Sequence, residues 1–196
     1  MIVYLHGFNS TGNSAKGQSL KKAFNKLSPA TPFLTPTYHY NPDVAISELI
    51  QEIKKQLAQH RLKQPEMIMG SSLGGFYAQY LAHQFHNIKL VMINPALGPV
   101  DTLQSHLGEN ENFYSGERYL LKQKHLDALK KYDIEKVCSD NVSSLLLIDK
   151  ADEIIDYHFA VEKYQHCAEV LLYQGGDHQF QHLPESIAKI NAFYSG

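Results

Sequence analysis

One short stretch of the chain, residues 70–75, places a serine among glycines at a spacing used in nucleophilic catalysis. It reads Gly-Ser-Ser-Leu-Gly-Gly, so Ser72 has a glycine two positions before it and another two positions after it. A serine on a sharp strand-to-helix turn has strained backbone angles and close neighbours, so these flanking positions favour residues without a Cβ. We predict that Ser72 is a nucleophile. Ser71 is the competing serine, but only Ser72 has both glycines in register.

A serine hydroxyl is a poor nucleophile at neutral pH, so it needs a histidine base and a carboxylate that orients this base. Two later loops offer these groups. Asp152 follows the apolar run 144–148, and His178 follows a pair of glycines after the run 169–173. Serine, aspartate and histidine in this order, each after an expected strand, form a known arrangement of the catalytic triad. We therefore predict Ser72, Asp152 and His178 as catalytic residues.

The acidic member of this triad has alternatives nearby in the sequence. Asp149 is nearer to the end of the expected strand and is the second candidate for the acid. Asp156 is expected to cap the following helix, and Asp177 to shape the loop of His178, to which it is adjacent. For the base, His182 falls toward the last expected helix, whereas the two glycines let the loop of His178 turn tightly.

An acyl-transfer site also needs backbone N–H groups that stabilise a negatively charged oxygen. Two such groups are expected. One belongs to Leu73, which follows the nucleophile at the start of a helix, and the other to Phe8, in the Gly-containing loop after the apolar run 2–5. We predict that these two N–H groups form an oxyanion hole. His6, in the same loop, is expected to order the loop by hydrogen bonding rather than to act in catalysis.

The elements that must position these residues follow from hydrophobic periodicity. Short apolar runs alternate with helical patterns along most of the chain, which predicts right-handed crossovers and a mostly parallel sheet of about six strands with helices on both faces. A proline interrupts the weak strand at 33–38 and favours an edge position or an early end. We expect strands at 2–5, 33–38, 67–69, 88–93, 144–148 and 169–173, and helices at 14–27, 41–60, 73–85 and 157–165, with a last helix from Pro184.

Residues 98–140 interrupt this alternation. The segment is polar, contains several aromatic residues and has one amphipathic helical pattern, at 119–131. Because a long insertion after a strand lies on the side of an open α/β sheet where ligands bind, we interpret it as a candidate lid. The alternative is a peripheral helical excursion that never contacts substrate.

Length and composition limit the remaining possibilities. A chain of 196 residues with 43% hydrophobic residues predicts one domain, residues 1–196, that is large enough for one core. A formal net charge of −2 gives no electrostatic reason to expect nucleic acid or an anionic membrane as a partner. No apolar run approaches the roughly 20 residues of a membrane span, and the first residues lack the features of a signal peptide. We expect a soluble, cytoplasmic protein.

The cysteines and histidines predict neither a metal site nor a disulfide. Cys138 and Cys167 are isolated and show no C-x-x-C spacing, so we expect two reduced, structural thiols. Most of the 11 histidines stand alone, and no pair has the spacing of a zinc-binding motif. We therefore expect neither a metal nor a cofactor.

With these residues placed, the chain resembles the YqiA-like esterase family of small bacterial α/β-hydrolases over essentially its full length. The motifs that carry the resemblance are Tyr4-Leu5-His6-Gly7-Phe8-Asn9-Ser10, Gly70-Ser71-Ser72-Leu73-Gly74-Gly75, Asp152-Glu153 and Gly175-Gly176-Asp177-His178-Gln179-Phe180. The resemblance implies an α/β-hydrolase fold and a cofactor-free serine esterase acting on short acyl esters and acyl-CoA thioesters. One departure is Ala151, where glycine is more usual in the family.

These observations lead to one main hypothesis and two alternatives. The main hypothesis is a hydrolase of small-molecule carboxylic esters or thioesters that works through an acyl-enzyme. The first alternative is a binding module that uses the same crevice for a small acyl or aromatic ligand without catalysis. The second is the same fold and triad with another reaction, such as peptidase, perhydrolase or carbon–carbon bond hydrolase activity, because fold alone does not fix the chemistry.

Overall fold

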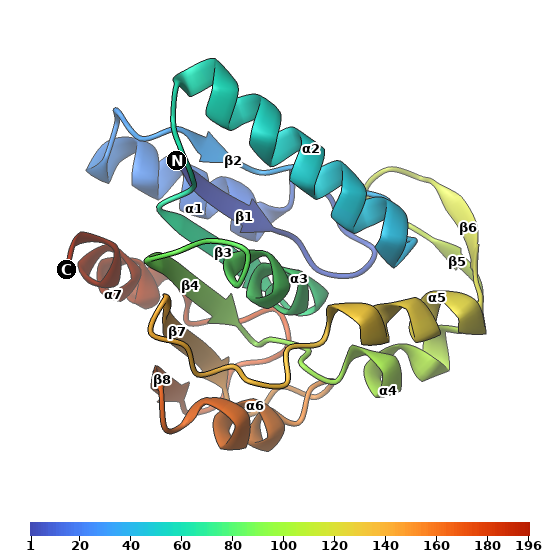
Figure 1. Cartoon of the computed structure of the whole chain (residues 1–196). Coiled ribbons are helices and arrows are strands. Elements are labelled where there is room, and N and C mark those ends of the chain that lie inside the picture. Colours follow the sequence, from blue (N-terminus) through green and yellow to red (C-terminus); the bar gives the residue numbers. More distant parts are fainter.

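A six-stranded parallel sheet forms the centre of the computed structural model, which describes all residues 1–196 (Figure 1). The strand order is β2-β1-β3-β4-β7-β8, and every neighbouring pair is parallel. The expected sheet is therefore confirmed. The strands are β1 (Ile2–Leu5), β2 (Phe33–Leu34), β3 (Met67–Ser71), β4 (Ile88–Ile93), β7 (Val142–Asp149) and β8 (Ala168–Tyr173).

The register of the strands brings their carboxyl ends to one edge of the sheet. Leu5 at the end of β1 lies opposite Gly70, and Ser71 at the end of β3 lies opposite Ile93. On the other side of the sheet, Asp149 at the end of β7 is paired in register with Tyr173. The loops that follow these strands therefore meet at a single edge, which is the usual position of ligand crevices in open α/β sheets.

Helices cover both faces of the sheet. Helices α2, α3 and α6 contribute to the larger hydrophobic cluster on one face, and α1 and α7 to the smaller cluster on the other face. The helices are α1 (Ala15–Leu27), α2 (Pro42–His60), α3 (Leu73–Ala82), α4 (Pro99–Leu103), α5 (Gln123–Leu129), α6 (Tyr157–Tyr164) and α7 (Leu183–Ser195), with 3₁₀ turns η1 (Gln104–His106) and η2 (Lys130–Tyr132).

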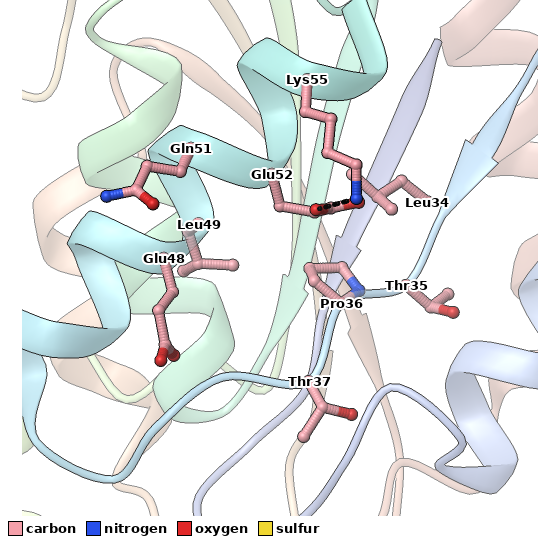
Figure 2. A pocket seen from close by; sticks show the side chains of 9 residues that line it. All are labelled: Leu34, Thr35, Pro36, Thr37, Glu48, Leu49, Gln51, Glu52 and Lys55. Atoms are coloured by element: carbon pink, nitrogen blue, oxygen red, sulfur yellow. Dashed lines mark hydrogen bonds and ion pairs between the residues drawn. The ribbon is translucent and has the colours of Figure 1, made fainter. Parts of the chain in front are cut away.

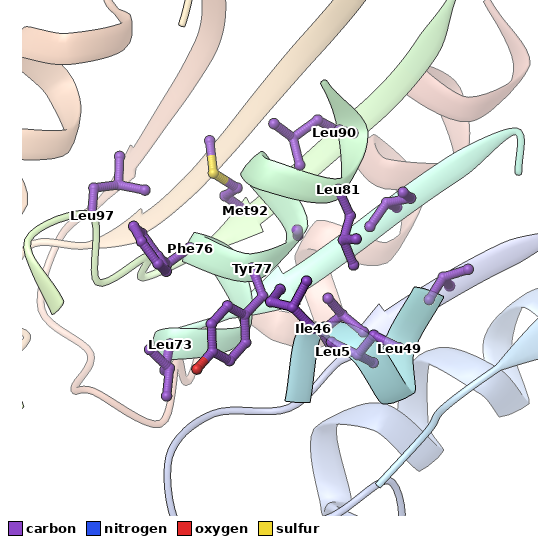
Figure 3. Packing of buried hydrophobic residues seen from close by; sticks show 14 of the residues in the cluster. Leu5, Ile46, Leu49, Leu73, Phe76, Tyr77, Leu81, Leu90, Met92 and Leu97 are labelled. Atoms are coloured by element: carbon purple, nitrogen blue, oxygen red, sulfur yellow. The ribbon is translucent and has the colours of Figure 1, made fainter. Parts of the chain in front are cut away.

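The helix that follows the serine motif is buried nearly all round. In α3, every residue except Tyr80 is buried, and Phe76 and Tyr77 pack among side chains of β1, α2 and β4 (Figure 3). A helix with this pattern belongs to a core rather than to a surface. The core therefore fixes the position of α3, and with it the turn that carries Ser72.

Local sequence signals set the beginnings of several helices. The side chain of Ser14 accepts a hydrogen bond from the Gly17 N–H, and Asn41 caps α2 in the same way, ahead of Pro42. Asp156 accepts the His158 N–H at the start of α6, as expected from the sequence. These caps satisfy N–H groups that the first turn of a helix leaves without partners.

Residues 98–140 form a small substructure beside the carboxyl ends of the strands. It contains α4, η1, an antiparallel hairpin of β5 (Gly108–Glu111) and β6 (Arg118–Leu121), and then α5 and η2. The amide of Asn112, in the hairpin, donates to the Ser10 carbonyl at 2.9 Å. The hairpin is thereby attached to the loop that follows β1.

One expected element was placed wrongly, and another is shorter than its expected range. The helix expected at 119–131 begins only at Gln123, because residues 119–121 pair with residues 108–110 in the hairpin. The weak strand at 33–38 ends at Leu34, two residues before Pro36, and lies at the edge of the sheet, so the edge position and early end that the proline favoured are both confirmed. No helix of the protein has the length and apolar character needed to cross a membrane.

The expectation of two reduced thiols was wrong. Cys138 and Cys167 form a disulfide, with their Cα atoms 5.5 Å apart. Cys138 precedes β7, and Cys167 directly precedes β8. Because β7 and β8 are hydrogen-bonded neighbours, their amino-terminal ends bring the two cysteines together. Sequence spacing alone does not contain this information, since it depends on which strands are neighbours.

This disulfide is expected to stabilise the fold. It closes a loop of 29 residues, so its loss should lower the free energy of unfolding by roughly 3–4 kcal/mol and the Tm by roughly 10 °C. Thermal unfolding of the oxidised protein, the reduced protein and the Cys138→Ser variant measures this change, and thiol titration of the denatured, unreduced protein should find no free thiol. Two titrating thiols, or an unchanged Tm after reduction, would contradict the assignment.

Candidate active site

Ser72 lies on the turn between β3 and α3 in a strained backbone conformation. Its φ is 54° and its ψ is −125°, a combination that non-glycine residues rarely adopt. Its side chain makes no capping hydrogen bond to α3, although it occupies the N-cap position. The hydroxyl group is therefore available to a group outside the helix.

Glycines allow this turn because backbone atoms approach closely from two directions. A Cβ at Gly70 would lie 2.0 Å from the Gly74 carbonyl oxygen. A Cβ at Gly74 would lie 2.3 Å from the carbonyl oxygen of Leu5 in β1. Neither neighbour can move away without displacing the sheet or the helix, so both positions require glycine. The expectation that the positions flanking Ser72 need residues without a Cβ is therefore confirmed at Gly70 and Gly74.

The structure brings Ser72, His178 and Asp152 into one hydrogen-bonded chain. His178 Nε2 lies 3.0 Å from Ser72 Oγ, and His178 Nδ1 lies 2.8 Å from Asp152 Oδ2 and 3.0 Å from Oδ1. The His178 side chain is 13% exposed and the Asp152 side chain 1% exposed. The three residues come from loops after β3, β7 and β8, which the parallel sheet places at one edge.

The carboxylate of Asp152 is held in its ionised form by its neighbours. Burial acts to raise the pKa of Asp152, but the hydrogen bond to His178 and the N–H groups of Ile155 and Ile154 outweigh burial and lower the pKa below its ordinary value. The two N–H groups donate to Oδ1 at 2.8 and 2.9 Å. An ionised Asp152 can orient the imidazole of His178 and stabilise its protonated form.

Asp149, the second candidate for the acid, contacts a different histidine. It is fully buried, and its Oδ1 lies 2.5 Å from Nδ1 of His182. Its other oxygen accepts the N–H groups of Gln181 at 2.8 Å and Asp177 at 3.3 Å. Asp149 therefore holds the loop on both sides of His178, and it forms no hydrogen bond with His178 itself.

Asn94 holds the same loop from the neighbouring strand. Its side-chain amide donates to the carbonyl of Asp177 at 2.9 Å, and its Oδ1 accepts the N–H of Asp149 at 2.8 Å. This role of Asn94 was missing from the sequence interpretation. The signal that could have indicated it is the polar residue directly after β4, at the edge where the other functional residues lie.

The two N–H groups expected to form an oxyanion hole border the same cavity as Ser72. Phe8 and Leu73 both line it, and the Phe8 N–H donates to no acceptor within the protein. Leu73 is the first residue of α3, so helix geometry provides no partner for its N–H. Both groups are therefore able to bind an external oxygen.

His6 is buried behind this loop and is held by local contacts. Its ring stacks on Tyr38 with 4.0 Å between centroids, and its Nδ1 lies 2.8 Å from the Gly7 carbonyl, to which it must donate. Burial lowers the pKa of His6 to about 4, so the ring is neutral at pH 7. These contacts order the loop before Phe8.

The cavity at Ser72 has a volume of about 580 Å³. Its lining combines residues of the turn between β3 and α3, which we call the elbow, of the loop after β1, of the start of α1 and of the segment 98–140. It includes Ser72, His178, Phe8, Leu73 and Phe113. Another cavity of similar volume lies between β2 and α2 (Figure 2). Its charged side chains include the Lys55–Glu52 ion pair, and it contains neither a histidine nor a serine, so it offers no comparable chemistry.

Comparison with solved structures identifies the fold of the chain. Est1E from Butyrivibrio proteoclasticus, solved with ferulic acid bound, superimposes with a TM-score of 0.77 at 13% identity, covering 98% of this chain and 86% of that one. Mouse α/β-hydrolase domain-containing protein 10 has a TM-score of 0.72 at 18% identity, with 99% and 89% covered. A monoacylglycerol lipase from Paleococcus ferrophilus has a TM-score of 0.64 at 14% identity, with 99% and 93% covered. The chain has an α/β-hydrolase fold.

The family follows from sequence comparison. The model of the family described as "Uncharacterised protein family (UPF0227)" matches residues 1–195, and the chain belongs to this family. A UPF0227 protein from Shewanella woodyi is 26% identical over 201 residues and is covered over the full length of both chains. The resemblance to the YqiA-like family is thereby confirmed.

The ionised state of Asp152 predicts a pH-dependent contribution to stability. Because the folded-state pKa of Asp152 is lowered, its contribution is present above the ordinary carboxyl pKa of 3.8 and is lost as the pH falls through the folded-state value. Asp152→Asn should therefore be less stable than wild type at pH 7, and this difference should shrink at about pH 2. Urea unfolding at both pH values measures it.

The matched control for this measurement is Asp101→Asn, which changes an exposed aspartate on α4. It should leave stability nearly unchanged at both pH values. Equal stability of Asp152→Asn and wild type at pH 7 would show that the Asp152 charge does not stabilise the folded state.

Proposed function

We propose that the protein is a serine hydrolase that cleaves carboxylic esters through an acyl-enzyme. The observation that carries this proposal is the hydrogen-bonded chain from Ser72 through His178 to Asp152. A hydroxyl, an imidazole and a buried carboxylate in this geometry are the groups required for attack on a carbonyl carbon. The elbow holds the hydroxyl at the border of a cavity large enough for a small ester.

In the first half of the reaction, Ser72 Oγ attacks the ester carbonyl carbon while His178 Nε2 accepts the hydroxyl proton. Asp152 stabilises the resulting imidazolium through Nδ1–H. The tetrahedral intermediate collapses when the bond to the alcohol oxygen breaks, and His178 donates the proton to this leaving oxygen. The acyl group is then bound to Ser72 as an ester.

In the second half, a water molecule replaces the alcohol. His178 removes a proton from this water, whose oxygen attacks the acyl carbon, and then returns the proton to Ser72 Oγ as the carboxylic acid leaves. The N–H groups of Phe8 and Leu73 are proposed to donate to the negatively charged oxygen in both tetrahedral intermediates. One such donor contributes about 10²–10³ in kcat in serine hydrolases.

The apolar part of the cavity lining supports a small acyl or aromatic substrate. Residues 98–140 contribute Pro99, Leu103, Phe113 and Tyr114 to this lining, so we propose that the segment covers the bound substrate as a lid. A structural neighbour is named a monoacylglycerol lipase, and another was solved with ferulic acid, which fits an ester of a small acid. Short acyl esters and acyl-CoA thioesters are the substrate classes that we propose to test.

Substitution of the triad tests this proposal. Wild type should hydrolyse at least one of p-nitrophenyl acetate, butyrate and octanoate, and Ser72→Ala and His178→Ala should each lower kcat at least ~1000-fold. A parallel series with acetyl-, butyryl- and octanoyl-CoA compares thioesters with esters. We expect kcat to fall in Ser72→Ala because no acyl-enzyme forms without Oγ. We expect it to fall in His178→Ala because the hydroxyl is not deprotonated without the imidazole.

Matched controls are Ser47→Ala on the exposed face of α2 and His158→Ala on α6, both outside the cavity. Each should retain the wild-type rate within about 2-fold. Hydrolysis by Ser72→Ala at the wild-type rate would overturn the mechanism. Absence of hydrolysis for all six substrates, together with no labelling of Ser72 by a fluorophosphonate, would favour a non-catalytic binding module.

A further inference from the structure

The lining of the cavity at Ser72 contains two chemically different groups of residues. One group is apolar and includes Phe8 of the loop after β1 and Pro99, Leu103 and Phe113 of the segment 98–140. The other is polar and lies beside the elbow, on the face of the sheet covered by α1: Tyr4, Ser14, Lys16 and Ser71. We call these four residues the polar cluster.

Hydrogen bonds connect the polar cluster to the residue next to the nucleophile. Lys16, in the first turn of α1, donates from Nζ to Ser71 Oγ at 2.9 Å. Tyr4, buried in β1, lines the same part of the cavity. Lys16, Ser71 and Ser72 all line the same cavity, so the ammonium group and the reacting hydroxyl face one binding space.

The charge of Lys16 has no partner of opposite sign. It is the only lysine or arginine among the residues that line the cavity, and no aspartate or glutamate lines it. Lys16 also forms none of the ion pairs of the protein. An ammonium group has three N–H donors, and Ser71 accepts only one of them. The others are available to a ligand in the cavity.

Holding Ser71 does not by itself account for a lysine at this position. A half-buried charge without an ion-pair partner is unfavourable, whereas a neutral donor would satisfy one hydroxyl at a smaller cost. Burial lowers the pKa of Lys16 to about 8, although the charges of Asp149, Asp152 and Asp177 act in the opposite direction. At pH 7 the side chain is therefore still mainly protonated. A ligand with a negative charge would provide the missing partner.

We propose that Lys16 binds an anionic group of the substrate, so that the preferred substrates are esters with a carboxylate or phosphate a few bonds from the ester carbonyl. This inference rests on the proposed esterase function and defines its substrate class. The apolar group of lining residues would take the uncharged part of the same substrate. Ser71 then has the role of positioning the Lys16 ammonium group for this contact.

Paired substrates of similar size, one with an anionic group and one without, test this specificity. On the alcohol side, the pair is 4-acetoxybenzoate and its neutral methyl ester, with 4-acetoxyphenyl phosphate as the phosphate analogue. On the acyl side, the pair is monophenyl glutarate and phenyl pentanoate. Wild type should prefer the charged member of at least one pair by about 10- to 100-fold in kcat/KM, the range expected for a hydrogen bond between charged groups.

Two substitutions of Lys16 then separate charge from structure. Lys16→Met keeps the length of the side chain but not its charge, and should abolish the preference, measured as the ratio of kcat/KM for the charged ester to kcat/KM for the neutral ester. Lys16→Arg keeps the charge and should retain most of the preference. An equal loss for charged and neutral esters in Lys16→Met would assign Lys16 a purely structural role and overturn the proposal.

The wild-type data distinguish this proposal from the esterase function on which it depends. Hydrolysis of the neutral esters with no preference for any charged member would leave the esterase function intact and overturn the role of Lys16. If Lys16→Met fails to fold, the wild-type preference and its retention in Lys16→Arg still decide the question. Hydrolysis of none of these esters, with no fluorophosphonate labelling of Ser72, would instead count against the esterase function.

Discussion

The close approach of backbone to backbone at the serine turn is the constraint on which the rest of the site depends. Gly74 lies so near Leu5 of β1, and Gly70 so near Gly74, that α3 has only one position against the sheet. This position requires a positive φ at Ser72, which is strained for a residue other than glycine. The buried packing of α3 offsets the free-energy cost of this strain. The direction of the Ser72 hydroxyl is thus set by the packing of the core.

Hydrogen bonds of polar side chains, rather than apolar packing, position the loop that carries His178. His178 lies on a loop after β8, and Asn94 after β4 and Asp149 at the end of β7 hold that loop through its backbone. Asp149 also binds His182, so two carboxylate–histidine pairs lie side by side, one facing Ser72 and one securing the loop. The second pair fixes the geometry of the first, because a loop without these bonds would leave the imidazole free to move away from the hydroxyl.

Much of this arrangement could be predicted from the sequence because it depends on local signals. Glycine spacing located the turn at Ser72, apolar runs located the strands, and the order of the loops selected His178 and Asp152. The disulfide between Cys138 and Cys167 and the anchoring role of Asn94 depend on which strands are neighbours, and no local pattern encodes that. The hairpin was missed because its strands are short and partly exposed, so their alternation is weak.

The central claim is that Ser72 forms a covalent acyl-enzyme, and trapping this intermediate tests it most directly. Wild type mixed with p-nitrophenyl acetate and quenched in acid should gain the mass of one acetyl group, and peptide mapping should place that group on Ser72 and not on Ser71. A burst of p-nitrophenol in the first turnover should accompany this acetylation, as expected when an acyl-enzyme forms and is then hydrolysed in a second step. Turnover with the acetyl group on another residue, or with no acylated protein at any time, would contradict the account.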